Sequence, residues 1–144
     1  MDLILWRHAD AEDGKPDLQR ELTGKGRKQA ARVADWLNAH LPKGYEVVSS
    51  PAARAMQTTQ ALGKSVKVDR SLAPGASTQA IVKAAGWPHG DGAVVLVGHQ
   101  PDFGVALAYL VSGRESGWRL EKAACWWLAE QPVIVKAVVS PDLL

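Results

Sequence analysis

Continuous apolar runs alternate with helix-spaced stretches along most of the 144-residue chain. The runs "LILW" at 3–6 and "AVVLVG" at 93–98 are typical of strands that are buried on both faces of a sheet. The segment "YEVVSS" at 45–50 predicts another strand, and "VKV" at 66–68 predicts a short one. The hydrophobic pattern therefore predicts a sheet whose strands are separated by long connections.

The first of these connections predicts a helix after a polar loop. Thr23 is a good N-cap residue, and the helix that it begins is expected to run to about Leu41. Ala30, Val33 and Leu37 recur at helical spacing and are expected to face the core.

Three further helices are predicted from capping residues. Ser50 followed by Pro51 reads as an N-cap and N1 pair that begins a helix ending near Gly63. Helices are also expected over 77–85 and over 101–111, each with a glycine at its C-terminal end.

The C-terminal tail predicts two more strands. The segments "ACWWLAE" at 124–130 and "PVIVKAVV" at 132–139 are joined at "EQP" and predict an antiparallel hairpin at the sheet edge. Strands that alternate with helices predict an α/β fold, here a three-layer α/β/α sandwich with a mostly parallel central sheet. We expect residues 1–144 to form a single domain.

Composition and charge exclude several classes of function. The formal net charge is +2, and the densest basic stretch, "GKGRKQ" at 24–29, is typical of an exposed helix start, so we expect no nucleic-acid binding. No apolar run approaches the roughly 20 residues of a membrane span, and no leader pattern is present. We therefore expect a cytoplasmic protein without a membrane partner. The lone cysteine, Cys125, lies in an apolar run and is interpreted as a buried, inert thiol.

Cationic and imidazole side chains follow three of the predicted strands. Arg7 and His8 follow the first strand, Arg54 lies in the first turn of the helix after the second, and His99 follows "AVVLVG". Because ligands of such sheets bind beyond the carboxyl ends of the strands, we expect these four side chains to share one pocket. Two guanidiniums, two imidazoles and two helix N-termini suit a dianion, above all a phosphoryl group.

Each of these residues alone has a common structural interpretation, and their convergence at one sheet edge favours a site. The other two histidines, His40 and His89, are interpreted as structural. Core or edge packing is expected for Trp36, Trp126 and Trp127.

Four segments together resemble a known family. "RHA" at 7–9, "LTGKGRKQA" at 22–30, "SSPAARAMQT" at 49–58 and "VGHQP" at 97–101 resemble the ordered motifs of the histidine phosphatase superfamily, which includes phosphoglycerate mutases and acid phosphatases. The compact length is similar to the small branch of the superfamily, the phosphohistidine phosphatases of the SixA type. The resemblance implies a phosphoglycerate mutase-like fold.

The resemblance also implies a role for each site residue. His8 would be the nucleophile that becomes phosphorylated, Arg7 and Arg54 would hold the phosphoryl oxygens, and His99 would be the second histidine of the phosphate site. A neutral imidazole attacks phosphorus, and water then hydrolyses the covalent phosphohistidine without a metal or other cofactor. The surrounding cations are expected to lower the pKa of His8.

The sequence departs from the family pattern beside the nucleophile. Many members carry Gly where this chain has Ala9, and Thr where it has Ala11. We expect the first change to add a methyl group near the pocket floor and the second to remove a hydroxyl contact to phosphate. Both changes leave open how fast the enzyme turns over.

The proton donor also departs from the pattern. Members that act on phosphate esters commonly carry an acid before the third helix, where this chain has Ser71, with Asp69 out of register. An alkoxide leaving group needs that proton, whereas imidazole leaves a phosphoramidate more easily. This favours phosphohistidine on a phosphorelay or phosphotransfer protein. The alternative is a phosphatase for small phosphate monoesters that uses Asp10 or Glu12 as its acid.

Two other classes stay open from the residues. One is a metal-dependent hydrolase with His8, Asp10 and His99 as ligands, although the neighbouring arginines would repel a metal ion. The other is a phosphate-binding module without catalysis.

Overall fold

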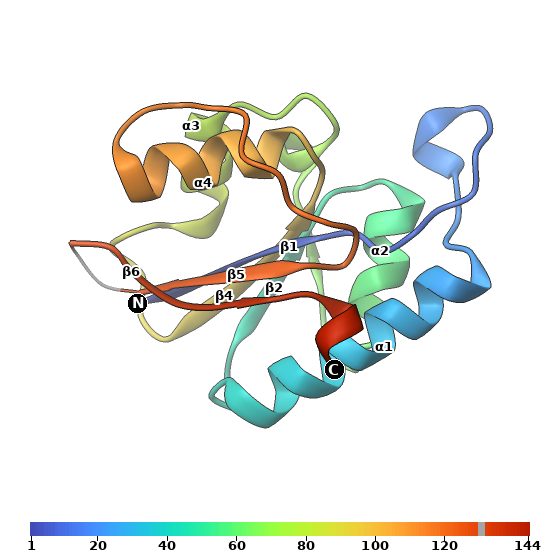
Figure 1. The fold of residues 1–144 in the computed structure, drawn as a ribbon, viewed down its shortest axis with the longest axis horizontal. Helices are drawn as coiled ribbons and strands as arrows, with labels where there is room; N and C mark the ends of the chain where they lie inside the picture. Colours follow the sequence, from blue (N-terminus) through green and yellow to red (C-terminus); the bar gives the residue numbers. More distant parts are fainter. Residues whose placement is uncertain (130–131) are drawn as a thin grey trace.

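A mixed sheet lies between two layers of helices (Figure 1). The computed structural model describes residues 1–129 and 132–144. In these residues the strands follow the order β3-β2-β4-β1-β5-β6 across one sheet. The strands are β1 (Asp2–Arg7), β2 (Glu46–Ser49), β3 (Lys67–Val68), β4 (Ala93–Gly98), β5 (Cys125–Ala129) and β6 (Ile134–Val139).

The inner part of the sheet is parallel, and the C-terminal part is antiparallel. Strand β4 pairs in parallel with β1 and β2, and β2 pairs in parallel with β3. Strand β5 runs antiparallel to β1, and β6 runs antiparallel to β5 at the edge. The predicted sandwich and its C-terminal edge hairpin are confirmed. Of the predicted junction "EQP", residues 130–131 lie outside the described residues.

The helices divide between the two faces of the sheet, with α1 and α2 on one side and α3 and α4 on the other (Figure 1). Alternate side chains of β1 enter different cores: Ile4 and Trp6 pack on the α1 side, and Leu3 and Leu5 on the α4 side. The helices are α1 (Gly24–His40), α2 (Ala53–Gln60), α3 (Thr78–Ala85) and α4 (Asp102–Ser112), with short 3-10 helices η1 (Asp17–Gln19), η2 (Arg70–Leu72) and η3 (Pro141–Leu143).

Capping explains where two helices begin. The Thr23 hydroxyl accepts a hydrogen bond from the Gly26 amide at 2.9 Å at the start of α1. The Ser77 hydroxyl accepts one from the Ala80 amide at 3.1 Å at the start of α3. Gly86 ends α3 in the left-handed region, with φ of 67°, which a glycine adopts without strain.

The predicted start of α2 was wrong, and two others were one residue early. Helix α3 begins at Thr78 and α4 at Asp102, each one residue later than predicted. Helix α2 begins at Ala53 and ends at Gln60, so Ser50 and Pro51 are not its N-cap and N1 residues. The Ser50 hydroxyl lies 2.7 Å from Nε2 of His99 instead, and Ala52, which has an extended backbone, takes the N-cap position. A contact with a distant strand therefore determines where α2 begins.

Cys125 is buried, as predicted, and burial raises the pKa of its thiol to about 12. The thiol therefore stays protonated and unreactive at neutral pH. Among the residues that the structure describes, no helix is both long and apolar enough to cross a membrane.

The remaining aromatic residues pack against the fold, as the sequence predicts. His40 donates from Nδ1 to the Trp36 carbonyl at 2.7 Å and stacks on the Trp36 ring. Trp127 is buried and meets Trp36 edge-on, while the Trp126 ring lies 5.7 Å from that of Trp118.

Candidate active site

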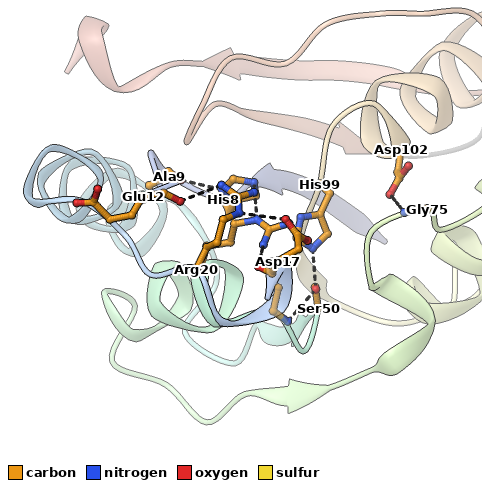
Figure 2. Close-up of polar contacts among 11 residues, drawn as sticks. His8, Ala9, Glu12, Asp17, Arg20, Ser50, Gly75, His99 and Asp102 are labelled. Atoms are coloured by element: carbon orange, nitrogen blue, oxygen red, sulfur yellow. Dashed lines mark hydrogen bonds and ion pairs between the residues drawn. The ribbon is translucent and has the colours of Figure 1, made fainter. Parts of the chain in front are cut away.

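The carboxyl ends of three parallel strands bring two imidazoles and a guanidinium together. His8 follows β1, His99 follows β4, and Arg54 is the second residue of α2, which follows β2. The two imidazole rings lie 5.2 Å apart between centroids (Figure 2). All three side chains are nearly inaccessible, with exposed fractions of 7% for His8 and 3% for Arg54 and His99. The structure thus brings together three of the four predicted residues, His8, Arg54 and His99.

The hydrogen bonds of His8 fix which ring nitrogen carries the lone pair. Nδ1 lies 2.7 Å from the Ala9 carbonyl, which can only accept, so Nδ1 carries the proton. Nε2 then carries the lone pair, and the Arg54 Nε–H donates to it at 3.3 Å. His8 therefore presents an unprotonated nitrogen to the guanidinium.

Both histidines are neutral at physiological pH. The pKa of His8 is lowered to about 4, mainly by burial and also by the charges of Arg54, Arg7 and Arg20, while the hydrogen bond to Ala9 acts in the opposite direction. Burial likewise lowers the pKa of His99 to about 3, with help from His8 and Arg54. The cations act in the predicted direction, but loss of water is the larger cause.

Arg7 reaches the site from the last position of β1. Its guanidinium donates to the Leu120 carbonyl at 2.8 Å, in the loop that precedes β5. Within the described residues, its Nε is buried and has no hydrogen-bond partner, and the same is true of Nδ1 of His99. These two buried nitrogens are donor or acceptor positions still open to a ligand.

Asp17 belongs to the site, and sequence reasoning missed it. One terminal nitrogen of Arg54 donates to the Asp17 carbonyl at 2.8 Å, and the other pairs with Asp17 Oδ2 at 3.1 Å. Arg20 pairs with Oδ1 of the same carboxylate at 3.0 Å. Figure 2 shows Asp17 between Arg20 and His99. Residues 10–21 read only as a polar loop, because η1 has neither periodicity nor a motif.

Two of the carboxylates considered as proton donors are held in their ionised form. Asp10 Oδ1 pairs with Lys122 at 2.7 Å, and its Oδ2 accepts from the Thr23 hydroxyl at 2.7 Å. Asp69 accepts from the amide and the hydroxyl of Ser71. These contacts lower the pKa of both carboxyl groups, so neither holds a proton near neutral pH.

Glu12, the third candidate, is exposed, and Figure 2 shows its carboxylate pointing away from His8. Its contacts with the loop are made by its backbone: the carbonyl accepts a hydrogen bond from Arg20 at 3.0 Å, and the amide donates to the Glu21 carbonyl at 2.8 Å.

Comparison with known proteins decides the family. Residues 3–76, just over half of the chain, match the model of the histidine phosphatase superfamily (branch 1). The chain belongs to this superfamily.

Individual relatives and solved structures match a larger part of this chain than the family model does. An uncharacterized protein of Picosynechococcus sp. (strain PCC 7002) is 37% identical over 115 residues, which are 72% of this chain and 69% of that protein. The protein histidine phosphatase SixA, solved in complex with tungstate, superposes with a TM-score of 0.87 at 25% identity over 99% of both chains. The phosphoserine phosphatase of Entamoeba histolytica, in complex with 3-phosphoglyceric acid, shares the fold at 17% identity, with a TM-score of 0.75 over 96% of both chains.

The superfamily motif at 22–30 positions the loop that follows His8. A Cβ atom at Gly26 would lie 2.0 Å from the Asp10 carbonyl oxygen, so only glycine lets α1 approach that loop. Gln29 accepts from the Asp10 amide at 2.9 Å, and Gln57 accepts from the Leu22 amide at 2.8 Å. The motif therefore acts through packing on the His8 loop.

The two departures from the superfamily pattern lie in different surroundings. Ala9 is fully buried, and its side chain belongs to the core on the α1 side. Its amide donates to the Thr58 hydroxyl at 3.1 Å, which links the loop to α2. Ala11 forms an isolated antiparallel bridge with Leu22.

His8, Asp10 and His99 do not assemble as a set of metal ligands. Within residues 1–129 and 132–144, no group of three or more His, Cys, Asp or Glu side chains is placed to hold a metal ion. Asp10 is engaged by Lys122 and Thr23 instead.

Proposed function

We propose that residues 1–144 act as one histidine phosphatase domain that hydrolyses phosphohistidine on a protein partner through a covalent intermediate at His8. The observation that carries the proposal is the state of His8, whose Nδ1 proton is committed to the Ala9 carbonyl while the Nε2 lone pair faces Arg54. A neutral, oriented imidazole beside a guanidinium is what nucleophilic attack on a phosphoryl group needs.

The proposed reaction has two steps. Nε2 of His8 attacks phosphorus, the P–N bond to the substrate imidazole breaks, and the departing imidazole takes up a proton from solvent. Water then attacks the phosphohistidine, which releases inorganic phosphate and returns His8 to its neutral form. Arg54 and Arg7 stabilise the phosphoryl oxygens through both steps, and His99 contributes the second imidazole.

The proton donors of the site favour phosphohistidine as the substrate. Asp10 and Asp69 are held as carboxylates, and the Glu12 carboxylate points away from His8. A phosphate ester needs an acid at its leaving oxygen, whereas the imidazole of a phosphoramidate leaves more readily. The likeness to SixA supports the same substrate class, and a phosphorelay or phosphotransfer protein would supply it.

Small phosphate monoesters are the second candidate substrates. The exposed Glu12 carboxylate, which forms no ion pair within the described residues, is the group that could reach such a leaving oxygen if its loop moved.

Turnover of a phosphohistidine peptide against an aryl phosphate separates the two candidates. We expect kcat/KM to be at least about ten-fold higher for the peptide, because the aryl ester lacks an acid partner. Activity is expected to persist in EDTA. A preference for the aryl ester would overturn the proposed substrate, and loss of activity in EDTA would overturn the metal-free mechanism.

A further inference from the structure

A groove of about 1010 Å³ runs beside the candidate active site, between α1, the loop before β5 and η3. The C-terminal η3 lies against α1 (Figure 1). Six of the residues that line the groove are basic: Arg7, Lys25, Lys28, Arg32, Arg119 and Lys122. Two acidic residues, Glu121 and Asp142, line it as well.

Within the described residues, the three groove cations that lie on α1 have no anionic partner. Arg119 pairs with Glu121 at 3.4 Å, and Lys122 pairs with Asp10 at 2.7 Å. Across the described part of the chain, Lys25, Lys28 and Arg32 form no ion pair, and all three are exposed. Their spacing of three and four residues places them on one face of α1.

The groove adjoins the candidate active site through Arg7, the residue before His8, and this separates it from an ordinary solvated helix face. Arg7 lines the groove, and its charge is among those that lower the pKa of His8. Lys122 lines it too and holds Asp10, two residues after His8. A molecule that binds along α1 therefore lies next to the segment that carries His8.

We propose that this groove binds an acidic segment that flanks the phosphohistidine of the partner protein. The inference rests on the proposed function. Lys25 and Arg32 are seven residues apart on a helix, or about 10 Å, which three or four residues of extended peptide would span. Two or three carboxylates in that span match the three free cations.

A peptide fits the groove better than a nucleic acid does. Glu121 and Asp142 would repel a continuous phosphate backbone, whereas a peptide can place neutral or donor groups beside them. Three unpaired cations also fall short of the many phosphate contacts that sustain nucleic-acid binding at physiological salt.

The test compares phosphohistidine peptides with acidic and neutral flanks, with acidic residues placed on either side of the histidine. One variant, the groove variant, removes the three free cations of α1 together through the changes Lys25→Gln, Lys28→Gln and Arg32→Gln. A matched control removes three exposed cations outside the groove: Arg27→Gln, Lys43→Gln and Lys67→Gln.

We expect the wild-type protein to have a KM about ten-fold lower for one acidic-flank peptide than for the neutral peptide at low salt. The groove variant should lose this difference with kcat unchanged, and the control variant should keep it. Phosphoimidazole, which is too small to reach the groove, should be hydrolysed equally by all three proteins. Added salt should remove the preference, since exposed charges are screened.

Equal KM values for acidic and neutral peptides in the wild type would overturn the groove proposal and leave the phosphatase proposal intact. If neither peptide is hydrolysed, the proposed function is wrong, and fluorescence anisotropy of the unphosphorylated acidic peptide decides the groove separately. The groove proposal would be overturned if the groove variant bound the acidic peptide as tightly as the wild type does. Tighter binding of a single-stranded oligonucleotide than of the acidic peptide would also overturn it.

Discussion

At the scale of single residues, Arg54 connects His8 to the carboxylate of Asp17. Its Nε donates to Nε2 of His8, while its two terminal nitrogens contact Asp17. A guanidinium offers paired donors to a carboxylate or a phosphoryl group with similar geometry. Asp17 therefore holds donors of Arg54 that a phosphoryl group would need. Its side chain is 56% exposed, so it can move away when a ligand enters.

Asp17→Asn is expected to strengthen binding of inorganic phosphate by about five-fold, because the change removes a negative charge that competes for Arg54. The measurement is the Kd for phosphate by calorimetry at pH 7. Asp13→Asn is the control, because Asp13 is an exposed acid of the same loop with no ion pair among the described residues. Weaker binding in Asp17→Asn would show that Asp17 positions Arg54 for the ligand and does not compete with it.

At the scale of elements, the N-terminus of α1 supports the loop that carries His8. Thr23 both caps the helix and donates to the Asp10 carboxylate, and Gly26 packs directly on the Asp10 carbonyl. Stability and activity should therefore respond together to a change at this junction.

Gly26→Ala is expected to lower the free energy of unfolding by about 2 kcal/mol, even though alanine favours helix, because its Cβ would overlap the Asp10 carbonyl. Activity should fall as well, since the displaced loop follows His8. Gly24→Ala is the control in the same helical turn, where a Cβ atom meets nothing within 4 Å. Urea denaturation measures both variants, and equal stabilities would contradict the packing described for α1.

Local signals predicted the elements well where local contacts decide them. The Thr23 cap and the Gly86 end depend on groups a few residues away, so the sequence was sufficient. The start of α2 was predicted wrongly because the Ser50 hydroxyl contacts His99, which is 49 residues away. No propensity of the segment itself encodes that contact.

At the scale of the whole molecule, the fold buries two neutral histidines, and this burial destabilises the folded protein at acidic pH. The pKa of His8 is about 4 and that of His99 about 3 in the folded protein, against 6.5 for an ordinary histidine. Between pH 7 and pH 5 the unfolded chain therefore binds more protons than the folded one, and stability falls as the pH falls.

The free energy of unfolding should decrease by about 2 kcal/mol per buried histidine between pH 7 and pH 5. The acidic groups with lowered pKa values do not contribute in this window, because their stabilisation is lost only at lower pH. Urea denaturation at the two pH values measures the effect. His99→Asn should remove about half of the decrease, and the exposed His89→Asn should leave it unchanged. A wild-type stability that does not change from pH 7 to pH 5 would contradict the neutral, buried state of the histidines.

The convergence of the site was predictable from the order of elements alone. Parallel strands end at one edge, so residues that follow β1, β2 and β4 must meet there. The place of Asp17 was not predictable, because an exposed polar loop can cross that edge in many ways. The tautomer of His8 was equally hidden, since it depends on the Ala9 carbonyl direction.

The central claim is that His8 carries the phosphoryl group during turnover. Incubation with phosphoramidate, followed by a rapid quench and peptide mapping by mass spectrometry, measures this directly. The account predicts an acid-labile, base-stable phosphoryl group on the peptide that contains residue 8, and no label in His8→Ala. Labelling of His8→Ala to the same extent as the wild type, or a label on another residue, would contradict it.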